Sequence, residues 1–378
     1  MTEQTADWRI FTCDSCGATL RYAPGTESLV CSYCGHVNPV DEVQLGADEL
    51  DYEATLRRLA LEPATDASEI VVHCDECGAT YRLEQGMHAG QCEFCGANVV
   101  VETRGKRQLE PQGVLPFEIT REQAEVAFRR WLGSLWLAPR GLKAYARHQR
   151  QLSGIYIPYW TFDSDSRAAY EGLRGTYYQV PEQVVTVVNG RRQVVTRMVT
   201  RIRWTPVAGR VSRAFDDVLV EASFSLPRRL LRKLDHWNLK ALKRYNPSYL
   251  SGFKSEMYQA GPRKGFEQAR SEMEEVLRAD IAYDIGGDLQ KITRMQADFD
   301  DVTFKHILLP VWVAAYKYRG KSYRFIVNGQ SGEVQGERPY SIWKVIGLLL
   351  LLMVLAGGLF WIMENSGLLE QAQYSYSP

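Results

Sequence analysis

The stretch "CDSCGAT" at residues 13–19 returns almost unchanged as "CDECGAT" at residues 74–80. A second pair of cysteines follows each copy, again 61 positions apart, so that each half reads C-x2-C-x14-C-x2-C. A pattern that recurs at one fixed offset indicates a duplicated module. The two sets use all eight cysteines of the chain: Cys13, Cys16, Cys31 and Cys34 in the first, and Cys74, Cys77, Cys92 and Cys95 in the second.

The spacing within each set is typical of a zinc ribbon. Two residues between cysteines let a tight turn direct both sulfurs at one point, and the glycine after the second cysteine (Gly17, Gly35) permits the positive φ of such turns. Two of these turns can close a tetrahedron of thiolates around one Zn2+. No coordination position is then left for water. We therefore predict two structural zinc ions and no catalytic metal.

Disulfides and rubredoxin-like iron are the other uses of paired cysteines. An even cysteine count suits disulfides, but secreted scaffolds rarely have this paired spacing, and no signal-peptide pattern precedes the first set. A module of about thirty residues cannot bury enough apolar surface to fold alone. Zinc binding worth about 10–16 kcal/mol offsets that deficit. Zinc is therefore favoured over both alternatives.

The charge of the chain is unevenly distributed. The 45 basic and 45 acidic residues balance overall, but residues 1–103 hold 18 acids against 5 bases. Each four-cysteine zinc site adds about −2 more. Nucleic acid requires a basic surface, so we expect the ribbons to bind protein and consider nucleic acid an unlikely partner.

An apolar stretch near the C-terminus, "VIGLLLLLMVLAGGLFWIM" at residues 345–363, runs for 19 residues without a charge. As a helix it would span about 28 Å, close to the thickness of the hydrocarbon core. Tyr340, Trp343 and Trp361 lie where interfacial aromatic residues are common. A buried core helix is the alternative, but such a helix is seldom apolar on every face. We predict one transmembrane helix.

Basic residues lie mainly before this segment. The positive-inside rule then places the N-terminal part in the cytoplasm, on the inner face of the plasma (inner) membrane, and a reducing cytoplasm suits thiolate-bound zinc. The flanking charges are Lys321, Arg324, Arg338 and Lys344 before the segment, and Glu364 and Glu370 after it.

The body between ribbons and anchor has the pattern of an α+β domain with mainly antiparallel sheet. Thr120 and Gln123 form a capping box for a helix that ends before Pro139, and helical periodicity returns near 226–243 and 264–279. Asn189-Gly190 indicates a β-hairpin. The expected units are ribbon 1 at 8–40, an acidic helical linker at 41–69, ribbon 2 at 70–103, the body at 104–341, the transmembrane helix at 342–364 and an extracytoplasmic tail at 365–378.

The segments "IYIPYW" at 155–160 and "ILLPVW" at 307–312 are also similar, at an offset of 152. This second, weaker repeat suggests that the body holds two related β lobes.

Four segments carry a resemblance to a known family: "SGIYIPYWTFD" at 153–163, "PVAGRVSRAFDDVLV" at 206–220, "DIGGD" at 284–288 and the long block at 301–341. They resemble bacterial zinc-ribbon membrane proteins of the TFIIB type, often labelled primosomal protein N-prime or helicase-like. The resemblance covers nearly the whole chain and implies a membrane platform associated with phage-shock and flotillin-like membrane-stress proteins. It also implies that the eight cysteines are metal ligands, and it supplies no catalytic residue.

Motifs of enzymes are missing from the sequence. A helicase requires G-x-x-x-x-G-K-[ST], which occurs nowhere, and H-E-x-x-H, G-x-S-x-G and G-x-G-x-x-G are also absent. His306 is more simply a strand-edge histidine than a general base. The pairs Asp216/Asp217 and Asp284/Asp288 suit turns and caps better than a carboxylate site. We expect no enzymatic activity.

Two basic stretches, residues 129–150 and 228–244, have several possible partners. They can be solvated faces of packed helices, contacts to an anionic lipid surface, nucleic-acid contacts, or docking sites for an acidic partner, which includes the acidic ribbons of the same chain. The sequence favours a membrane-anchored scaffold that recruits a cytoplasmic protein partner. A nucleic-acid-binding membrane protein, or an enzyme with an unrecognised site in the body, are the alternatives.

Overall fold

The computed structural model describes residues 7–40, 45–61, 71–73, 80–82, 87–91, 98–102, 109–139, 152–188, 191–234, 236–318 and 321–365. The second cysteine set, the hairpin turn at 189–190 and the tail at 366–378 lie outside these residues. Among the described elements strands outweigh helices, as expected for an α+β body with mainly sheet.

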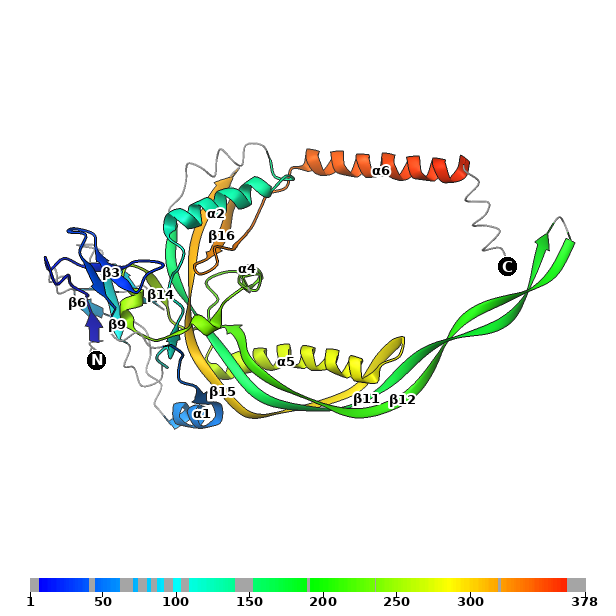
Figure 1. The fold of residues 1–378 in the computed structure, drawn as a ribbon, viewed down its shortest axis with the longest axis horizontal. Helices are drawn as coiled ribbons and strands as arrows, with labels where there is room; N and C mark the ends of the chain where they lie inside the picture. The colour runs from blue at the N-terminus through cyan, green and yellow to red at the C-terminus, as the bar shows by residue number, and fades with distance from the viewer. Residues whose placement is uncertain are drawn as a thin grey trace.

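One large, strongly curved sheet runs through the molecule (Figure 1). Its centre is three long strands: β11 (Ser153–Val188) pairs antiparallel with both β12 (Arg191–Glu221) and β15 (Leu289–Tyr318). The path β1-β9-β8-β14-β11-β15-β10-β13 includes parallel pairs at β10/β15 and β11/β14, so the sheet is mainly but not wholly antiparallel.

Short strands extend this sheet on either side of the three long ones. Their bounds are β1 Asp7–Arg9, β5 Leu50–Asp51, β8 Met87–Gln91, β9 Asn98–Glu102, β10 Gly113–Val114, β13 Lys243–Arg244, β14 Lys254–Glu256, β16 Lys321–Asn328 and β17 Val334–Gly336. β1, β8 and β9 lie in the two predicted ribbon segments. The N-terminal modules therefore contribute strands to the body's own sheet.

The burial of side chains changes along β11, which has three parts. Residues 156–162 are buried on both faces, because the sheet has packed layers on either side there. Residues 164–170 alternate between buried and exposed, which is the period-two pattern of a strand covered on one face. Beyond residue 175 the strand is mostly exposed. These three parts nevertheless form one continuous strand of 36 residues.

Helix α5 (Pro262–Ile285) covers the half-buried part of the long strands (Figure 1). It begins with proline at its first position, where the missing N–H costs nothing, and ends at Gly286 with φ of 64°. Its buried stripe recurs every four residues, which confirms and lengthens the helix predicted near 264–279. The stripe consists of Ala269, Met273, Leu277, Ile281 and Ile285.

The helix predicted at 226–243 is wrong. The structure has one helical turn, α4 (Arg228–Leu231), a 3-10 turn, η1 (Leu239–Ala241), and then strand β13. The leucines that suggested a helical stripe are buried, but in a cluster of irregular chain packed on the sheet. His236, Trp237 and Asn238 are weak helix formers, and tertiary contacts decide their conformation.

The two similar segments pair directly with each other. Ile155 opposes Val311 and Tyr159 opposes Ile307, in antiparallel register. They therefore share one sheet rather than each forming a sheet of its own.

Three further helices lie in the described residues. α1 (Tyr52–Leu61) lies in the predicted linker, and α2 (Arg121–Ser134) has the predicted capping box, with Thr120 Oγ1 accepting from Gln123 N at 3.3 Å and Thr120 N donating to Gln123 Oε1 at 2.8 Å. α6 (Ile342–Asn365) leaves the body as a single rod (Figure 1). The remaining elements are β2 Leu20–Tyr22, β3 Ser28–Cys31, β4 Val37–Pro39, β6 Val71–His73, β7 Thr80–Arg82 and η2 Pro247–Leu250.

Candidate metal centre

The first cysteine set is carried by a small three-stranded sheet, β2-β3-β4. Each cysteine pair forms a tight turn: Gly17 N donates to Cys13 O at 2.8 Å, and Gly35 N donates to Cys31 O at 3.0 Å. Both glycines have positive φ, 75° and 73°, as the sequence pattern predicts. These turns aim the two cysteine pairs at each other.

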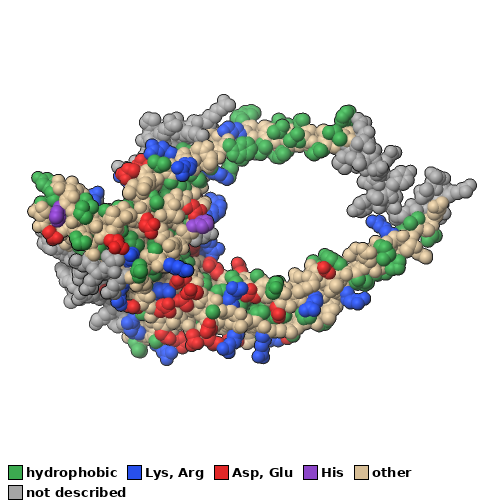
Figure 2. Space-filling view, viewed as in Figure 1, with side chains coloured by type: hydrophobic (Ala, Val, Ile, Leu, Met, Phe, Trp, Pro, Cys, Tyr) green, Lys and Arg blue, Asp and Glu red, His purple; other side chains and the backbone are tan. Residues whose placement is uncertain are grey.

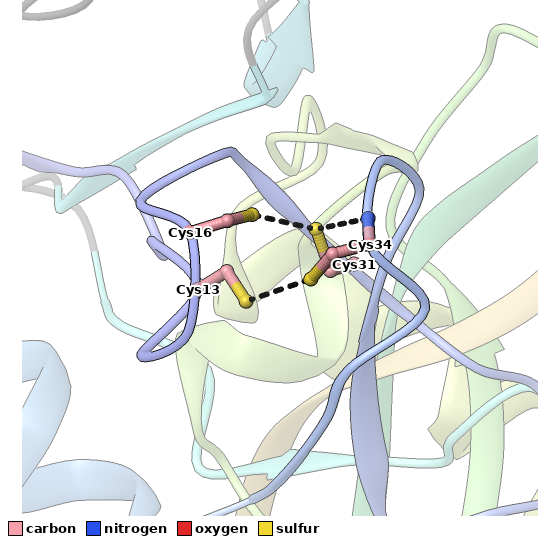
Figure 3. Close-up of side chains that lie close together, drawn as sticks. All are labelled: Cys13, Cys16, Cys31 and Cys34. Carbon is pink, nitrogen blue, oxygen red and sulfur yellow. Dashed lines mark hydrogen bonds between the residues drawn. The ribbon is translucent and has the colours of Figure 1, made fainter.

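The four sulfurs meet at one point (Figure 3). Cys13 Sγ lies 3.6 Å from Cys34 Sγ, Cys16 Sγ lies 3.6 Å from Cys31 Sγ, and all four lie within 4.8 Å of one another. A disulfide would require about 2.05 Å. A tetrahedral zinc ion with bonds of about 2.3 Å separates its sulfurs by about 3.8 Å. The first set therefore fits a zinc ion and not a disulfide.

A backbone hydrogen bond favours the thiolate of Cys31. Cys34 N donates to Cys31 Sγ at 3.5 Å, and this backbone hydrogen bond lowers the pKa of the Cys31 thiol to about 6. Cys13 and Cys31 are buried, whereas Cys16 and Cys34 are exposed, so the site lies at the surface of the module. Four thiolates complete a tetrahedral shell and leave no position for a substrate, so such a metal would be structural.

The second cysteine set is outside the described residues, so a second zinc site stays a prediction. The strands that flank it are described. β6 pairs with β7, and β8 pairs with β9, both antiparallel. β8 and β9 occupy the positions that β3 and β4 hold 61 residues earlier.

Ribbon 1 is built into the body. Tyr22 N donates to Ser251 O at 3.0 Å, Ser251 Oγ donates to Leu20 O at 2.8 Å, and Gly25 N donates to Phe117 O at 2.8 Å. The rings of Tyr22 and Tyr249 pack edge to face at 5.2 Å. The core of the ribbon is therefore continuous with a core of the body. The sequence contains no local signal for this docking.

Ion pairs reinforce the same contact. Lys243 Nζ lies 2.8 Å from Glu27 Oε1, and Arg244 pairs with Asp48. Both cations belong to the basic stretch 228–244. Other cations of that stretch pair within the body, Arg232 with Glu272 at 2.9 Å and Arg228 with the buried Glu221 at 3.7 Å. Four cations of this stretch thus pair with acidic groups of the same chain.

A second charged cluster joins the linker to the sheet. Lys305 Nζ lies 3.2 Å from Glu49 Oε1, 3.3 Å from Asp163 Oδ2 and 2.9 Å from Asp217 Oδ1. Carboxylate oxygens of Asp163, Asp216 and Asp217 lie within 4.8 Å of one another, but the Lys305 ammonium already neutralises part of this charge. Asp217 has φ of 53° and lies at an irregularity in the β11–β12 register, so Asp216 and Asp217 form a bulge within strand β12 and not the predicted turn or cap. No motif in the sequence points to Asp163 or Lys305.

The other candidate residues have structural roles. His306 is not the strand-edge histidine that the sequence suggested, because it lies within the central strand β15 opposite Trp160. It is fully buried against Trp160 and Tyr258, and its Nδ1 lies 3.0 Å from Leu109 O. Burial lowers the pKa of His306 to about 4. Asp284 accepts a hydrogen bond from Tyr170.

Helix α6 is the single helix in the described part of the chain that is long and apolar enough to cross a membrane. No residue of the segment Ile342–Leu359 is buried. Its first turn is held to the body, because Lys344 Nζ donates to Trp136 O at 2.8 Å and Ala138 O at 2.7 Å. Length, composition and exposure are consistent with a membrane anchor.

Comparison with known proteins gives one relative. The chain is similar to a protein of Bacillus subtilis (strain 168) described as "Uncharacterized protein YdjG", with 26% identity over 336 residues, which cover 89% of this chain and 91% of the relative. No family model matches the chain. No solved structure matches it either. The resemblance to zinc-ribbon membrane proteins thus stays a prediction.

Proposed function

We propose that the protein is a membrane-anchored zinc-ribbon scaffold that holds a protein partner at the cytoplasmic face of the membrane. The observation that supports it best is the combination of a closed four-cysteine site with a wholly exposed apolar helix on the same body. A closed thiolate shell favours a structural role over catalysis. An apolar helix without burial requires lipid or another protein to cover it.

The orientation follows from the charges beside α6. The basic residues precede the helix, so the ribbons and the body face the cytoplasm, and the tail faces the opposite side. The resemblance described above suggests that the partner belongs to a membrane-stress system of the phage-shock or flotillin-like kind.

The partner surface that we favour is the exposed side of ribbon 1. Tyr33 lies between the cysteines of the second turn and is 86% exposed, and Val37 on β4 is 54% exposed. Exposed aromatic and apolar side chains beside a rigid site are typical of docking surfaces. The acids Glu27, Asp48 and Glu49 pair with the body instead, so we expect capture to depend more on apolar contact than on charge.

Crosslinking in native membranes tests this proposal. The full chain and the double variant Tyr33→Ala with Val37→Ala are crosslinked, purified and compared by quantitative mass spectrometry. Both side chains are exposed, so the variant should retain its zinc and its abundance. At least one protein captured by the wild type should be lost by the variant. The matched control is Tyr283→Ala, which removes an equally exposed tyrosine from α5. Identical capture by all three chains would contradict the proposal.

A further inference from the structure

The hairpin of β11 and β12 extends far beyond the rest of the sheet (Figure 1). The third strand, β15, stops pairing with β11 at Gly175, opposite Leu289. From there residues 176–188 and 191–204, here called the arm, form a ribbon of two strands whose outer edges pair with no other described strand. Two-stranded ribbons are marginally stable in water, and open edges invite a partner. We therefore expect the arm to be a binding surface.

The two faces of the arm differ in character. Cross-strand pairing places Tyr177 opposite Ile202, and Val185 opposite Val194, on one face. The large side chains on this face are exposed by 49% at Tyr177, 54% at Met198, 62% at Val185 and 63% at Val194. Gln179, Gln183, Thr196 and Thr200 share this face, so it is a mixed face on which large exposed apolar side chains recur along its length.

The opposite face carries arginines. Arg197, Arg201 and Arg203 are all exposed on it, and the Arg203 guanidinium lies 4.9 Å from the centre of the Tyr178 ring. The arm contains five arginines and a single acid, Glu182, which lies 3.8 Å from Arg201. Hydrophobic and basic side chains dominate its visible surface (Figure 2). Arginine beside exposed tyrosine, tryptophan and valine is the composition of segments that bind the interface of an anionic bilayer.

The position of the arm agrees with a lipid partner. The arm and α6 leave the body on the same side, away from the ribbons (Figure 1). A bilayer that receives α6 is thus within reach of the arm. The open strand edges exclude the arm from the hydrocarbon core, where every backbone group requires a protein partner. The headgroup layer is the remaining place, because it supplies water and phosphate to those edges.

We propose that the arm lies along the anionic headgroup layer beside the anchor, with its apolar face toward the acyl boundary and its long arginine side chains reaching phosphates. This proposal rests on the proposed membrane anchor. For both to hold, α6 must turn relative to the body at the link 337–341, because α6 and the arm project in the same general direction, well apart from each other, in Figure 1. The Lys344 contacts to residues 136 and 138 are the bonds that such a turn would strain or break.

Site-specific photocrosslinking tests this proposal on the full chain. Benzoylphenylalanine replaces Tyr177 on the arm or, as a matched control, Tyr33 on ribbon 1, another exposed tyrosine far from the arm. Each purified chain is reconstituted, one copy per nanodisc, in phosphatidylcholine alone or with about a third of phosphatidylglycerol. After irradiation, adducts are identified by mass. Tyr177 should give lipid adducts, several-fold more with the anionic lipid, and Tyr33 should give almost none.

A charge variant provides the second measurement. Arg201→Gln with Arg203→Gln removes two cations from the arm, and each basic residue near an anionic surface contributes a factor of about five. Lipid adducts at position 177 should fall about tenfold or more in anionic nanodiscs and little in neutral ones. Arg57→Gln with Arg58→Gln, which removes two exposed cations from α1, should change nothing.

The anchor and the arm can fail separately. Resistance of the chain to alkaline extraction from proteoliposomes tests the anchor alone. A chain that resists extraction but gives no lipid adduct at position 177 would overturn the proposal for the arm. Adducts between two chains, when vesicles hold several copies, would identify a second copy as the occupant and overturn it as well.

Discussion

The Lys243 ammonium lies 2.8 Å from a carboxylate oxygen of Glu27, 216 positions earlier in the chain, and joins the body to ribbon 1. Together with the Arg244–Asp48 and Lys305–Glu49 pairs, this contact explains part of the charge asymmetry of the sequence. The acidic N-terminal part and the basic body neutralise each other within one molecule. Ribbon 1 is therefore fixed on the body, and its removal would expose a core.

The docking of ribbon 1 predicts different costs for two similar glycine substitutions. Gly25 and Gly46 both have positive φ, 76° and 87°, so alanine at either site meets backbone strain of about 1 kcal/mol. At Gly25 the added Cβ would also lie 3.1 Å from Glu118 O of the body, whereas at Gly46 nothing lies within 4 Å. Chemical denaturation should show a larger loss for Gly25→Ala than for Gly46→Ala. Equal losses of stability in the two variants would mean that the close approach of residue 25 to Glu118 O has no effect.

Lys305 should be far more important for stability than Lys243. Lys305→Met leaves Asp163, Asp217 and Glu49 without their shared cation, at a cost of about 3 kcal/mol. Lys243→Met breaks a pair whose acid, Glu27, is mostly exposed, which should cost less than about 1 kcal/mol.

The stability that is lost in Lys305→Met should also depend on pH. Burial raises the pKa of Asp163, and loss of the ammonium raises it further. A carboxyl group whose pKa is higher in the folded than in the unfolded protein lowers the free energy of unfolding. The effect is largest at pH values above the folded-state pKa, where the group is ionised. The deficit of Lys305→Met should therefore shrink as the pH is lowered from 7 toward 4.5. Unfolding curves at several pH values check this, and a deficit independent of pH would contradict it.

Metal content tests the duplicated cysteine sets. Purified protein should contain two equivalents of zinc by elemental analysis, and Cys31→Ser and Cys92→Ser should each remove one. Cys31→Ser should also lower the stability of the body, because the core of ribbon 1 packs on Tyr249 and its neighbours. One equivalent in the wild type, or iron in place of zinc, would show that a set has been misassigned.

His306 should make folding sensitive to mild acid. Its pKa in the folded protein is about 4, below the ordinary 6.5, because burial removes water from the ring and disfavours the charged imidazolium. As the pH falls below 6.5 the unfolded chain takes up the proton first, so stability is lost on the acid side. Between pH 7 and 5 the wild type should lose about 2 kcal/mol more than His306→Gln. Zinc retention is measured at both pH values as the control, and parallel losses would exclude this role for His306.

The features that the sequence predicted correctly have local signals. The cysteine turns, the capping box of Thr120 and Gln123, and the helix before Gly286 depend on residues within a few positions of one another. The hairpin was indicated by Asn189-Gly190, and β11 and β12 do pair across it, from Val188 opposite Arg191 onward.

The features that the sequence did not reveal depend on distant partners. Leu230 and Leu234 follow helical spacing, yet they are buried in irregular chain because the sheet beneath them sets their positions. No local signal indicates that β11 runs unbroken for 36 residues through Pro158 and Pro181. The Lys305–Glu49 and Lys243–Glu27 pairs each join residues more than 200 positions apart in the chain, and no periodicity of the sequence indicates them.

The location of the captured partner tests the central claim most directly. In cells with the wild-type chain, the partner identified by crosslinking should be found in the membrane fraction, as measured by quantitative fractionation. In cells with Tyr33→Ala and Val37→Ala, the chain itself should stay in the membrane at normal abundance with its zinc bound, and the partner should move to the soluble fraction. A partner that stays at the membrane in the variant cells would contradict the proposed role of the ribbon.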